Sequence, residues 1–389
     1  ACEIEDNFFM HNPDAIVIGA GIVGACSALS LTNAGLRVLV IDRGSVSSGT
    51  TGAGEGNILV SDKNPGPELV LGLRSRDLWF ELQEDVGDSF ELEAKGGLVV
   101  ARADDSQLMA LANVQEQQGV AILKADHAQL HQLEPYLHPD ISSGVFYPQD
   151  SQCQPMLAAA HILRAVIKRG GSFVSQAQVT KIQTSGSRVT GVETTQGNFS
   201  SPIIINATGT WAGEIARLAG SSLPISPRRG FILVTEPAPQ YIFHKVYDSD
   251  YVANVASSDA DLQTSTVVEG TRSGTILIGA SRERVGFDGE MNYAILRTLA
   301  AQATSLFPVL RDVQLLRAYR GFRPYTPDHL PVIGEDAHIG GLWHSAGHEG
   351  AGIGLAPGSA SLITDAIIGR DSFMDYSPFS HARFAKVGV

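Results

Sequence analysis

The stretch that decides the fold is "DAIVIGAGIVGACSALSLTNAGLRVLVIDRG", residues 14–44. Residues 15–18 form a short apolar run rich in β-branched side chains, which is typical of a buried parallel strand. Apolar residues then recur at near-helical spacing up to Ala34, and "RVLVID" at 37–42 predicts a second buried strand that ends at Asp42. The stretch therefore predicts a complete strand–turn–helix–strand unit.

Three glycines in the first turn, Gly19, Gly21 and Gly24, complete a G-x-G-x-x-G pattern. We expect Gly19 to make the tight turn, Gly21 to let the backbone approach a pyrophosphate, and Gly24 to let helix and strand pack closely. The helix start, at Ile22 and Val23, would offer backbone N–H groups to the phosphates. The pattern predicts a dinucleotide site, and a purely structural glycine turn is the alternative.

The residues that follow this unit favour FAD over NAD. Asp42 stands eighteen residues after Gly24, where it can accept a hydrogen bond from a ribose hydroxyl. The next segment, "RGSVSSGTTGAGEGNI" at 43–58, is too rich in glycine, serine and threonine for another strand–helix unit. It would supply backbone amides and small hydroxyls to a long, extended cofactor. A flexible surface loop is the alternative interpretation of this segment.

Composition limits the classes of function. The chain has 389 residues, 43% of them hydrophobic and 18% charged, which is enough for two cores and predicts two domains. Its formal net charge of −13 repels phosphate backbones, so we expect no nucleic-acid partner. The three cysteines are far apart and lack C-x-x-C spacing, which predicts reduced thiols in a cytoplasmic protein and no zinc or cluster site.

Two further expectations concern membranes and the N-terminus. We expect no apolar run to approach the roughly 20 residues that cross a bilayer, so we predict no transmembrane segment. The first residues are acidic and lack the basic region of a signal peptide. Residues 1–12 are expected to form an arm outside the fold.

Four stretches together resemble the D-amino-acid oxidase and glycine oxidase superfamily of FAD enzymes. The stretches are "IVIGAGIVG" with Asp42, "GTTGAGEGN" at 49–57, "IIINATGTWAGEIA" at 203–216, and "RPYTPDHLPVIG" at 323–334 running into "LWHSAGHEGAGIGLAPGSA" at 342–360. The resemblance covers most of residues 14–367. It implies an α/β fold: a Rossmann-like FAD-binding domain with an inserted α+β substrate domain on a mostly antiparallel sheet.

The resemblance also implies which residues hold a non-covalent FAD. The residue matching Val179 would hold the adenine through its backbone, in an edge strand predicted at 178–182. Members that tether flavin covalently have a cysteine where this chain has Gly321. The full set of expected cofactor contacts is Gly19, Gly21, Ile22, Val23, Gly24, Asp42, Arg43, Thr50, Thr51, Gly52, Gly56, Asn57, Val179, Ala207, Thr208, Gly209, Trp211, Gly347, His348, Gly350, Gly352 and Ile353.

Arg323 matches the family's arginine that reaches into the cavity above the flavin and binds the substrate carboxylate with two hydrogen bonds. A guanidinium suits this role because it gives two parallel N–H donors and stays charged at any working pH. The alternative is that Arg323 pairs with Asp328 or caps a turn. Arg320 is the weaker candidate, expected at a strand end facing solvent. Glycine oxidases have a further site residue in the loop around His348, and Gly350 stands at that position in this chain. This difference leaves more room near the flavin, which weakens any claim that glycine itself is the substrate.

Two histidines near the C-terminus, His344 and His348, lie four residues apart. We do not expect a metal there, because Gly347, Gly350 and Gly352 break any helix that would align the imidazoles and no third ligand is evident. His348 is interpreted as a catalytic-site neighbour of the flavin, with a plain loop residue as the alternative. The glycine-rich loop around it is expected to open a helix that faces the flavin.

The inserted domain is predicted from stretches of sequence in which strand and helix patterns do not alternate. "RRGFILVTE", "YVANVAS", "TSTVVEG" and "TILIGASRERVGFD" indicate an antiparallel sheet that roofs the cavity. Tyr251 is the candidate for an aromatic lid over the substrate; Tyr247 is the other, and core packing is the alternative for either. Glu269 is expected to be a solvated strand-end charge, with a contact to a substrate amine as the alternative.

The predicted domain limits follow from these assignments. The FAD-binding domain is assigned residues 11–90, 150–224 and 321–389, and the substrate domain is assigned residues 91–149 and 225–320. The family's reaction implies hydride removal from the carbon of a small carboxylate-bearing amine to flavin N5, giving an imine that water hydrolyses to an oxo acid. No protein base is required if the amine enters neutral.

Three functions remain open at this point. The first is an oxidase of amino acids or N-substituted amino acids, reoxidised by oxygen. The second is the catalytic subunit of a multi-subunit dehydrogenase, because "GHEGAGIGLAP" at 347–357 is similar to proline dehydrogenase, opine oxidase and hydrogen cyanide synthase subunits that pass electrons to a partner. The third is a flavin-binding scaffold without turnover. The sequence leaves the oligomeric state open.

Overall fold

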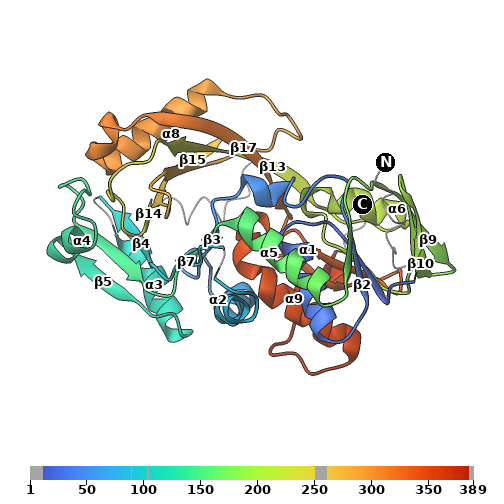
Figure 1. Ribbon diagram of the computed structural model, residues 1–389. Coiled ribbons are helices and arrows are strands. Elements are labelled where there is room, and N and C mark those ends of the chain that lie inside the picture. The colour runs from blue at the N-terminus through green and yellow to red at the C-terminus, as the bar shows by residue number, and fades with distance from the viewer. Residues whose placement is uncertain (1–11, 89, 103–104, 250–260, 385–389) are drawn as a thin grey trace.

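The computed structural model describes residues 12–384 except 89, 103–104 and 250–260. Figure 1 shows two lobes, each built around a β-sheet. The first sheet is parallel except for β18, which is antiparallel to β19. In sheet order its strands are β18 (Val332–Glu335), β19 (Leu342–Ala346), β12 (Ile204–Asn206), β1 (Ala15–Ile18), β2 (Val38–Ile41) and β8 (Ser172–Val174).

The predicted strand–turn–helix–strand unit is present as β1, α1 (Ile22–Asn33) and β2. Successive strand side chains point to opposite faces, so β1 contributes to two cores. Ala15 and Val17 pack on the helical side, whereas Ile16 and Ile18 pack on the other side. Because both faces are covered, every residue of these two strands is buried, which explains the continuous apolar runs in the sequence.

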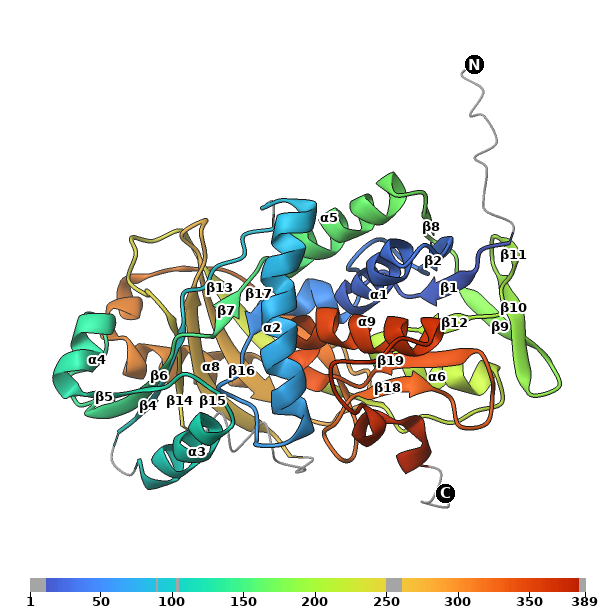
Figure 2. The same ribbon diagram turned by 90° about the horizontal axis from the view of Figure 1, so that it is seen from below.

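Helices cover one face of this sheet, where α1 packs against the helices on either side of it. A further helix, α2, packs against α9, and its Trp79 donates the indole N–H to the carbonyl oxygen of Ile353, at 3.1 Å, which fixes the start of the C-terminal helix. Figure 2 shows α2 lying between the two lobes, beside α9. The covering helices are α2 (Pro67–Val86), α5 (Pro155–Lys168) and α9 (Gly352–Ile368).

The opposite face is covered by a small antiparallel sheet and α6 (Ala212–Leu218). The order of that sheet is β11 (Gly197–Ser200), β10 (Arg188–Thr194) and β9 (Val179–Ser185). The strand predicted at 178–182 is β9, which lies at an edge as expected.

The second lobe contains an eight-stranded sheet that is antiparallel except for the pair β14 and β4. Helix α8 (Tyr293–Leu306) packs on it, while α3 (Ser106–Gln117) and α4 (His127–Leu133) lie near its other end. In sheet order the strands are β17 (Leu315–Tyr325), β13 (Ser226–Thr235), β16 (Ile276–Arg282), β15 (Gln263–Gly270), β14 (Lys245–Asp248), β4 (Gly97–Ala101), β6 (Ser143–Tyr147) and β5 (Leu123–Asp126).

The predicted roof is therefore a sheet of mostly antiparallel strands. Three of the four predicted runs form β13, β15 and β16, and "YVANVAS" lies in the segment outside the described residues. Strand β17 crosses the domain boundary predicted between residues 320 and 321. The assignment of chain ranges to two domains remains a proposal. A short pair, β3 (Asn57–Ile58) and β7 (Ser151–Gln152), completes the described strands.

One stretch is longer and more apolar than the sequence interpretation allowed. Residues Glu349–Ile368 form a helical run of 20 residues that is long and apolar enough to cross a membrane, so the expectation that no run approaches this length is wrong. Most of the run is buried inside the molecule, where α9 packs against α1 and α2. This environment is that of a core helix.

Candidate active site

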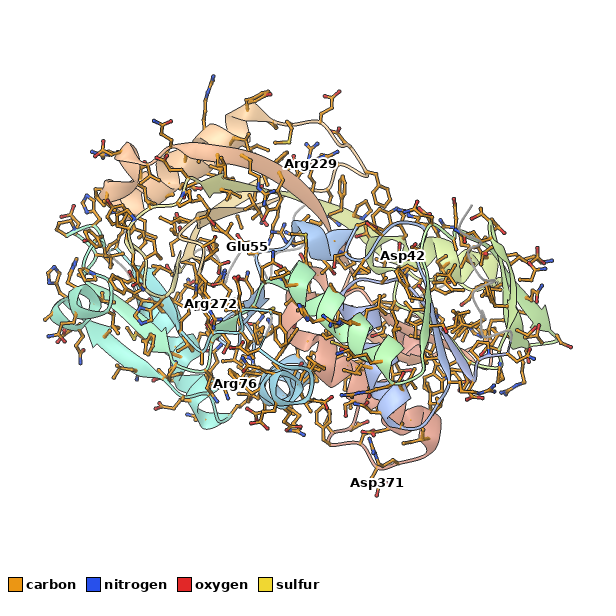
Figure 3. The ribbon with its side chains drawn as sticks, viewed as in Figure 1. Asp42, Glu55, Arg76, Arg229, Arg272 and Asp371 are labelled. Atoms are coloured by element: carbon orange, nitrogen blue, oxygen red, sulfur yellow. The ribbon has the colours of Figure 1, made fainter. Side chains whose placement is uncertain are left out.

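A cavity of about 720 Å³ lies between the two sheets. Its wall begins at the turn after β1 and continues through η1 (Thr50–Ala53), β9 and η2 (Gly209–Trp211) to β13, β17 and the start of α9. Figure 3 labels two acids of the wall, Asp42 on the side of the first lobe and Glu55 nearer the middle of the molecule. The cavity joins segments from the whole length of the chain.

The first turn is as tightly packed as its glycines suggested. Gly19 has a φ of +113°, and a Cβ there would lie 2.5 Å from the carbonyl oxygen of Ala207. A Cβ on Gly24 would overlap the carbonyl oxygen of Gly19, so the helix reaches the strand only because this residue has no side chain. Gly21 lines the cavity, and a Cβ there would lie 2.9 Å from Oγ1 of Thr51.

Hydrogen bonds fix this turn against its neighbours. The Ile22 N–H donates to Oγ1 of Thr51 at 3.0 Å, which ties the start of α1 to η1. The carboxylate of Asp42 accepts from the Ala20 and Gly44 N–H groups, both at 2.7 Å. A carboxylate has about four lone-pair positions, so Asp42 can still accept a ribose hydroxyl on the side that faces the cavity.

A second set of contacts connects the two lobes at the cavity wall. The hydroxyls of Thr50 and Thr210 both donate to the carbonyl oxygen of Phe322 in β17, at 2.8 and 2.9 Å. The guanidinium carbon of Arg43 lies 4.2 Å from the centre of the Trp211 ring. The two hydroxyl contacts hold η1 and η2 against the roof sheet, and Arg43 packs on the Trp211 ring of η2.

Most of the expected cofactor contacts line the cavity. Four do not: Gly24, Gly52, Gly56 and Gly347 instead permit close packing behind the wall. Tyr251 lies outside the described residues. The predicted residues in the wall are Gly19, Gly21, Ile22, Val23, Asp42, Arg43, Thr50, Thr51, Asn57, Val179, Ala207, Thr208, Gly209, Trp211, Arg323, His348, Gly350, Gly352 and Ile353.

Arg323 lies in β17 and lines the cavity. Its Nη1 donates to the carbonyl oxygen of Ser281 at 2.9 Å. A Cβ on Gly230, in the neighbouring strand β13, would overlap this Nη1, so the missing side chain makes room for the guanidinium. Asp328, the partner considered for Arg323, pairs with Arg383.

Arg320 departs from its expected place. Its side chain is not a solvent-facing strand end: the residue is half-buried, and the guanidinium carbon lies 6.0 Å from the centre of the Phe322 ring. Arg320 is not among the described residues that line the cavity. Of the two candidate arginines, the structure brings only Arg323 to the site.

The loop before α9 forms the end of the cavity next to Arg323. His348 is 4% exposed, its Nε2 lies 2.9 Å from Oγ of Ser359, and burial lowers its pKa to about 4. The imidazole is therefore neutral at physiological pH. Gly352 and Ile353 place the N-terminal end of α9 at the wall, where the helix dipole favours negative charge. A helix opening at this loop was expected.

Two acidic residues were misjudged or missed. Glu269 is not a solvated charge: it is fully buried, and its Oε2 accepts from Nζ of Lys245 at 2.9 Å. Burial raises the pKa of Glu269, while Lys245 opposes the shift. Glu349, which was not proposed as a site residue from the sequence, lines the cavity, is ion-paired with Arg228, and has one carboxylate oxygen 3.2 Å from Nδ1 of His329. Tyr247 is a buried core residue that donates to Ser61, not a lid.

His344 and His348 do not form a pair, but His344 has neighbours that the sequence did not reveal. Asp336, His344 and His381 are buried with potential ligand atoms within 4.8 Å of one another, so the statement that no third ligand is evident is wrong for His344. Protein groups already bond these atoms: His344 Nε2 lies 2.9 Å from Asp336, and His381 Nε2 lies 2.8 Å from the Ser222 carbonyl. The cluster needs no metal to satisfy these groups.

Comparison with known proteins places this arrangement in a family. A family model described as DAO, FAD dependent oxidoreductase, matches residues 14–366. The chain is 30% identical to the bifunctional protein ThiO/ThiG of Trichormus variabilis, covering 96% of this chain and 55% of that protein, so it spans about half the length of that curated relative. It is 25% identical to the glycine oxidase of Geobacillus kaustophilus over 97% of this chain and 99% of that protein.

A solved structure shares the fold. The L-proline dehydrogenase from P. horikoshii superposes with a TM-score of 0.88 at 23% identity, over 97% of this chain and 99% of that chain. The match of the family model extends over both lobes and every segment of the cavity wall. This chain belongs to the DAO family of FAD-dependent oxidoreductases.

Proposed function

We propose that this protein oxidises the carbon–nitrogen bond of a small amino acid or N-substituted amino acid. The observation that carries the proposal is the position of Arg323, a cation of the roof sheet in the wall of the cavity that also contains the glycine turn after β1. A cavity that combines a dinucleotide turn with a guanidinium suits a redox cofactor and an anionic substrate together.

The residues of the cavity fit FAD held without a covalent bond. The turn at Gly19 and Gly21 and the start of α1 would hold the pyrophosphate, and Asp42 would accept a ribose hydroxyl. Neither Cys26 nor Cys153 is in the described wall. The N-terminal end of α9 would stabilise negative charge on the ring system. When bound, FAD supplies an acceptor for a hydride from the carbon that bears the amine.

Arg323 would bind the carboxylate of the substrate. Its bond to the Ser281 carbonyl fixes one edge of the guanidinium, and a fixed fork positions a carboxylate with little loss of side-chain freedom. Positioning of this kind can lower a barrier by about 7 kcal/mol or more. Because His348 is neutral, it contributes no charge that would compete for the carboxylate.

The amine would have to lose its extra proton before the carbon gives up hydride. The neutral His348 accepts a proton poorly, because burial keeps its pKa near 4. A substrate that enters with a neutral amine avoids this requirement. We therefore expect the rate at subsaturating substrate to rise with pH as the amine of the free substrate deprotonates.

Anaerobic mixing of the purified protein with glycine, sarcosine, D-alanine, D-proline, L-proline and an opine tests the proposal. Bleaching of the flavin absorbance, with rapid recovery in air, is expected for an oxidase. Bleaching without recovery in air would identify the alternative, a catalytic subunit that passes electrons to a protein partner. If no compound bleaches the flavin, amino-acid oxidation with this panel is refuted. Cytoplasmic location belongs to the same proposal and is tested by cell fractionation.

A further inference from the structure

We propose that Glu349 is a specificity-determining residue, which excludes ligands that carry a second anionic group near the carboxylate bound by Arg323. The inference rests on the proposed function and narrows its substrate class to amines with one carboxylate. Glu349 begins η4 (Glu349–Ala351), in the loop between β19 and α9, and lines the cavity. It is 8% exposed, so most of its side chain is covered by protein.

Glu349 lies beside the arginine that is proposed to bind the carboxylate. The next residue, Gly350, is so close to Arg323 that a Cβ there would lie 3.8 Å from Nε of the guanidinium. Arg228 of β13 and Arg323 of β17 are partners in the antiparallel register, so their side chains point to the same face of the sheet. Nη1 of Arg228 donates to Oε1 of Glu349. Both arginines and the glutamate therefore belong to one part of the site.

The ion pair presents its negative member to the cavity. Arg228 is fully buried and is not in the described wall, whereas Glu349 is part of the wall. Burial raises the pKa of the glutamate carboxyl, but the hydrogen bond with His329 and the charges of Arg228 and Arg282 hold it below its usual value. Glu349 is therefore an anion at neutral pH.

Protein groups already satisfy the Glu349 carboxylate. Its Oε1 accepts from Arg228, and its Oε2 lies 3.2 Å from Nδ1 of His329. The carboxylate therefore needs no cationic ligand, which agrees with an amine that enters neutral. A second anionic group of a ligand would instead lie next to a carboxylate, and like charges placed together oppose binding.

The backbone of Glu349 also marks the residue. Its φ is +46°, in the left-handed region that glycine adopts readily and glutamate does not. Strained residues of this kind gather at ligand sites. An ion pair that only stabilises the fold is the alternative. Removal of such a pair would weaken all ligands equally, whereas loss of a specificity-determining charge changes the ratio of their affinities.

The inference divides the possible substrates by charge. Glycine, sarcosine, alanine and proline have one carboxylate and bring no second anion to Glu349. An opine has a second carboxylate near its nitrogen, and an acidic amino acid has one on its side chain. We expect both kinds to be poorer substrates than monocarboxylates of similar size. Arg323 alone would not make this distinction, because a guanidinium attracts every carboxylate.

Two pairs of ligands that differ in charge test this inference by calorimetric titration of the FAD-loaded protein. The first pair is malonate and malonamate, and the second is succinate and succinamate. Each pair replaces one carboxylate by an amide of nearly the same size, and none of the four ligands is an amine. The titrations are done above neutral pH, where both carboxyls of each diacid are ionised. The wild-type protein is expected to bind the amide of at least one pair more tightly, roughly tenfold.

The Glu349→Gln variant keeps the size of the side chain and removes its charge. The ratio of the two affinities in the preferred pair is expected to shift toward the diacid by roughly tenfold or more. The matched control is Glu283→Gln, because Glu283 is also 8% exposed and pairs with the neighbouring Arg229, but is not in the described wall. This control is expected to keep the wild-type ratio. Comparison of ratios between proteins cancels the effect of two equivalent carboxylates in a diacid.

A second variant covers the case in which Glu349→Gln does not fold. A buried charge that loses its partner is strongly destabilising, and Glu349→Gln leaves Arg228 in this position. The double variant Arg228→Gln/Glu349→Gln removes both charges of the pair. Its ratio is expected to shift toward the diacid in the same direction, by less than in Glu349→Gln. Flavin absorbance verifies that each variant is loaded.

Two outcomes overturn the inference. The first is a wild-type protein without preference for either amide. The second is a wild-type ratio in the loaded Glu349→Gln variant, or in the loaded double variant if the single one does not fold. If none of the four ligands binds the loaded wild-type protein, the carboxylate site of the proposed function fails, and the inference falls with it. Binding of the amides that is lost in Arg323→Ala would show that the proposed function survives even when Glu349 has no role.

Discussion

The position of the Arg323 guanidinium can be shifted without removing it, by the substitution Gly230→Ala. The added Cβ would lie 2.6 Å from the carbonyl oxygen of Ser281 and would overlap Nη1 of Arg323. Ordinary contacts of a Cβ begin at 3.4 Å. The strand must therefore move by about 0.8 Å to clear the Ser281 carbonyl, the guanidinium must move as well, and the bond between Nη1 and Ser281 must lengthen or break.

A misplacement of about 1 Å in a group that positions substrate costs roughly 10²-fold in rate. We therefore expect Gly230→Ala to lower kcat/KM about ten- to hundredfold while FAD remains bound. Arg323→Ala should have an effect of at least this size, because a hydrogen bond to a charged group is worth about 1.5–3 kcal/mol. Stopped-flow reduction of the flavin, over a range of substrate concentrations, measures both variants.

The double variant decides whether the two effects have one cause. If Gly230→Ala acts through the guanidinium, adding it to Arg323→Ala should cause little further loss, because the moved group is already absent. If the double variant instead shows a loss of kcat/KM equal to the product of the two single losses, this reasoning is refuted. A Gly230→Ala variant with wild-type kcat/KM would also contradict it. Flavin content, measured by absorbance, excludes loss of cofactor as the cause.

Three other substitutions test separate parts of the structure. Gly21→Val should abolish FAD binding, because its side chain would displace Thr51 and fill the approach to the first turn; a normal flavin spectrum of the purified variant would contradict this. Burial lowers the pKa of His348 from 6.5 to about 4. Between these pH values the imidazole is protonated in the unfolded chain but not in the folded protein. The free energy of unfolding therefore falls as the pH drops through this window, by up to about 3 kcal/mol. Urea denaturation at pH 7 and pH 4.5 should show a smaller loss for His348→Gln than for the wild type, and equal losses would exclude this role of His348. Lys245→Met should lower the free energy of unfolding by about 3–5 kcal/mol, because it leaves Glu269 buried without its closest cation; urea denaturation checks this, and Lys245→Met/Glu269→Gln should recover part of the loss.

Local pattern was sufficient for the first strand–turn–helix–strand unit of the first lobe. The glycine turn, its strand and its helix are contiguous, and each residue is constrained by neighbours within about thirty positions. Gly24 could be assigned to close packing because a helix that follows a strand so tightly leaves no space for a Cβ, and the structure places the Gly19 carbonyl there. The strand runs of the roof sheet were recognisable because β-branched residues gather in them, although their order in the sheet was not.

The sequence by itself predicted the glycine turn with its flanking strands and helix, because these depend on spacing along the chain, and the resemblance to a family pointed to Arg323. Only the tertiary structure decided which charges are buried and with which partners. Glu269 is paired with Lys245, 24 residues away, and Asp336 meets His344 and His381 across separate segments. One carboxylate oxygen of Glu55 is buried because it lies against Gly279 of a distant strand. The electrostatic energy of such a group depends on its neighbours in space, and spacing along the chain does not specify them.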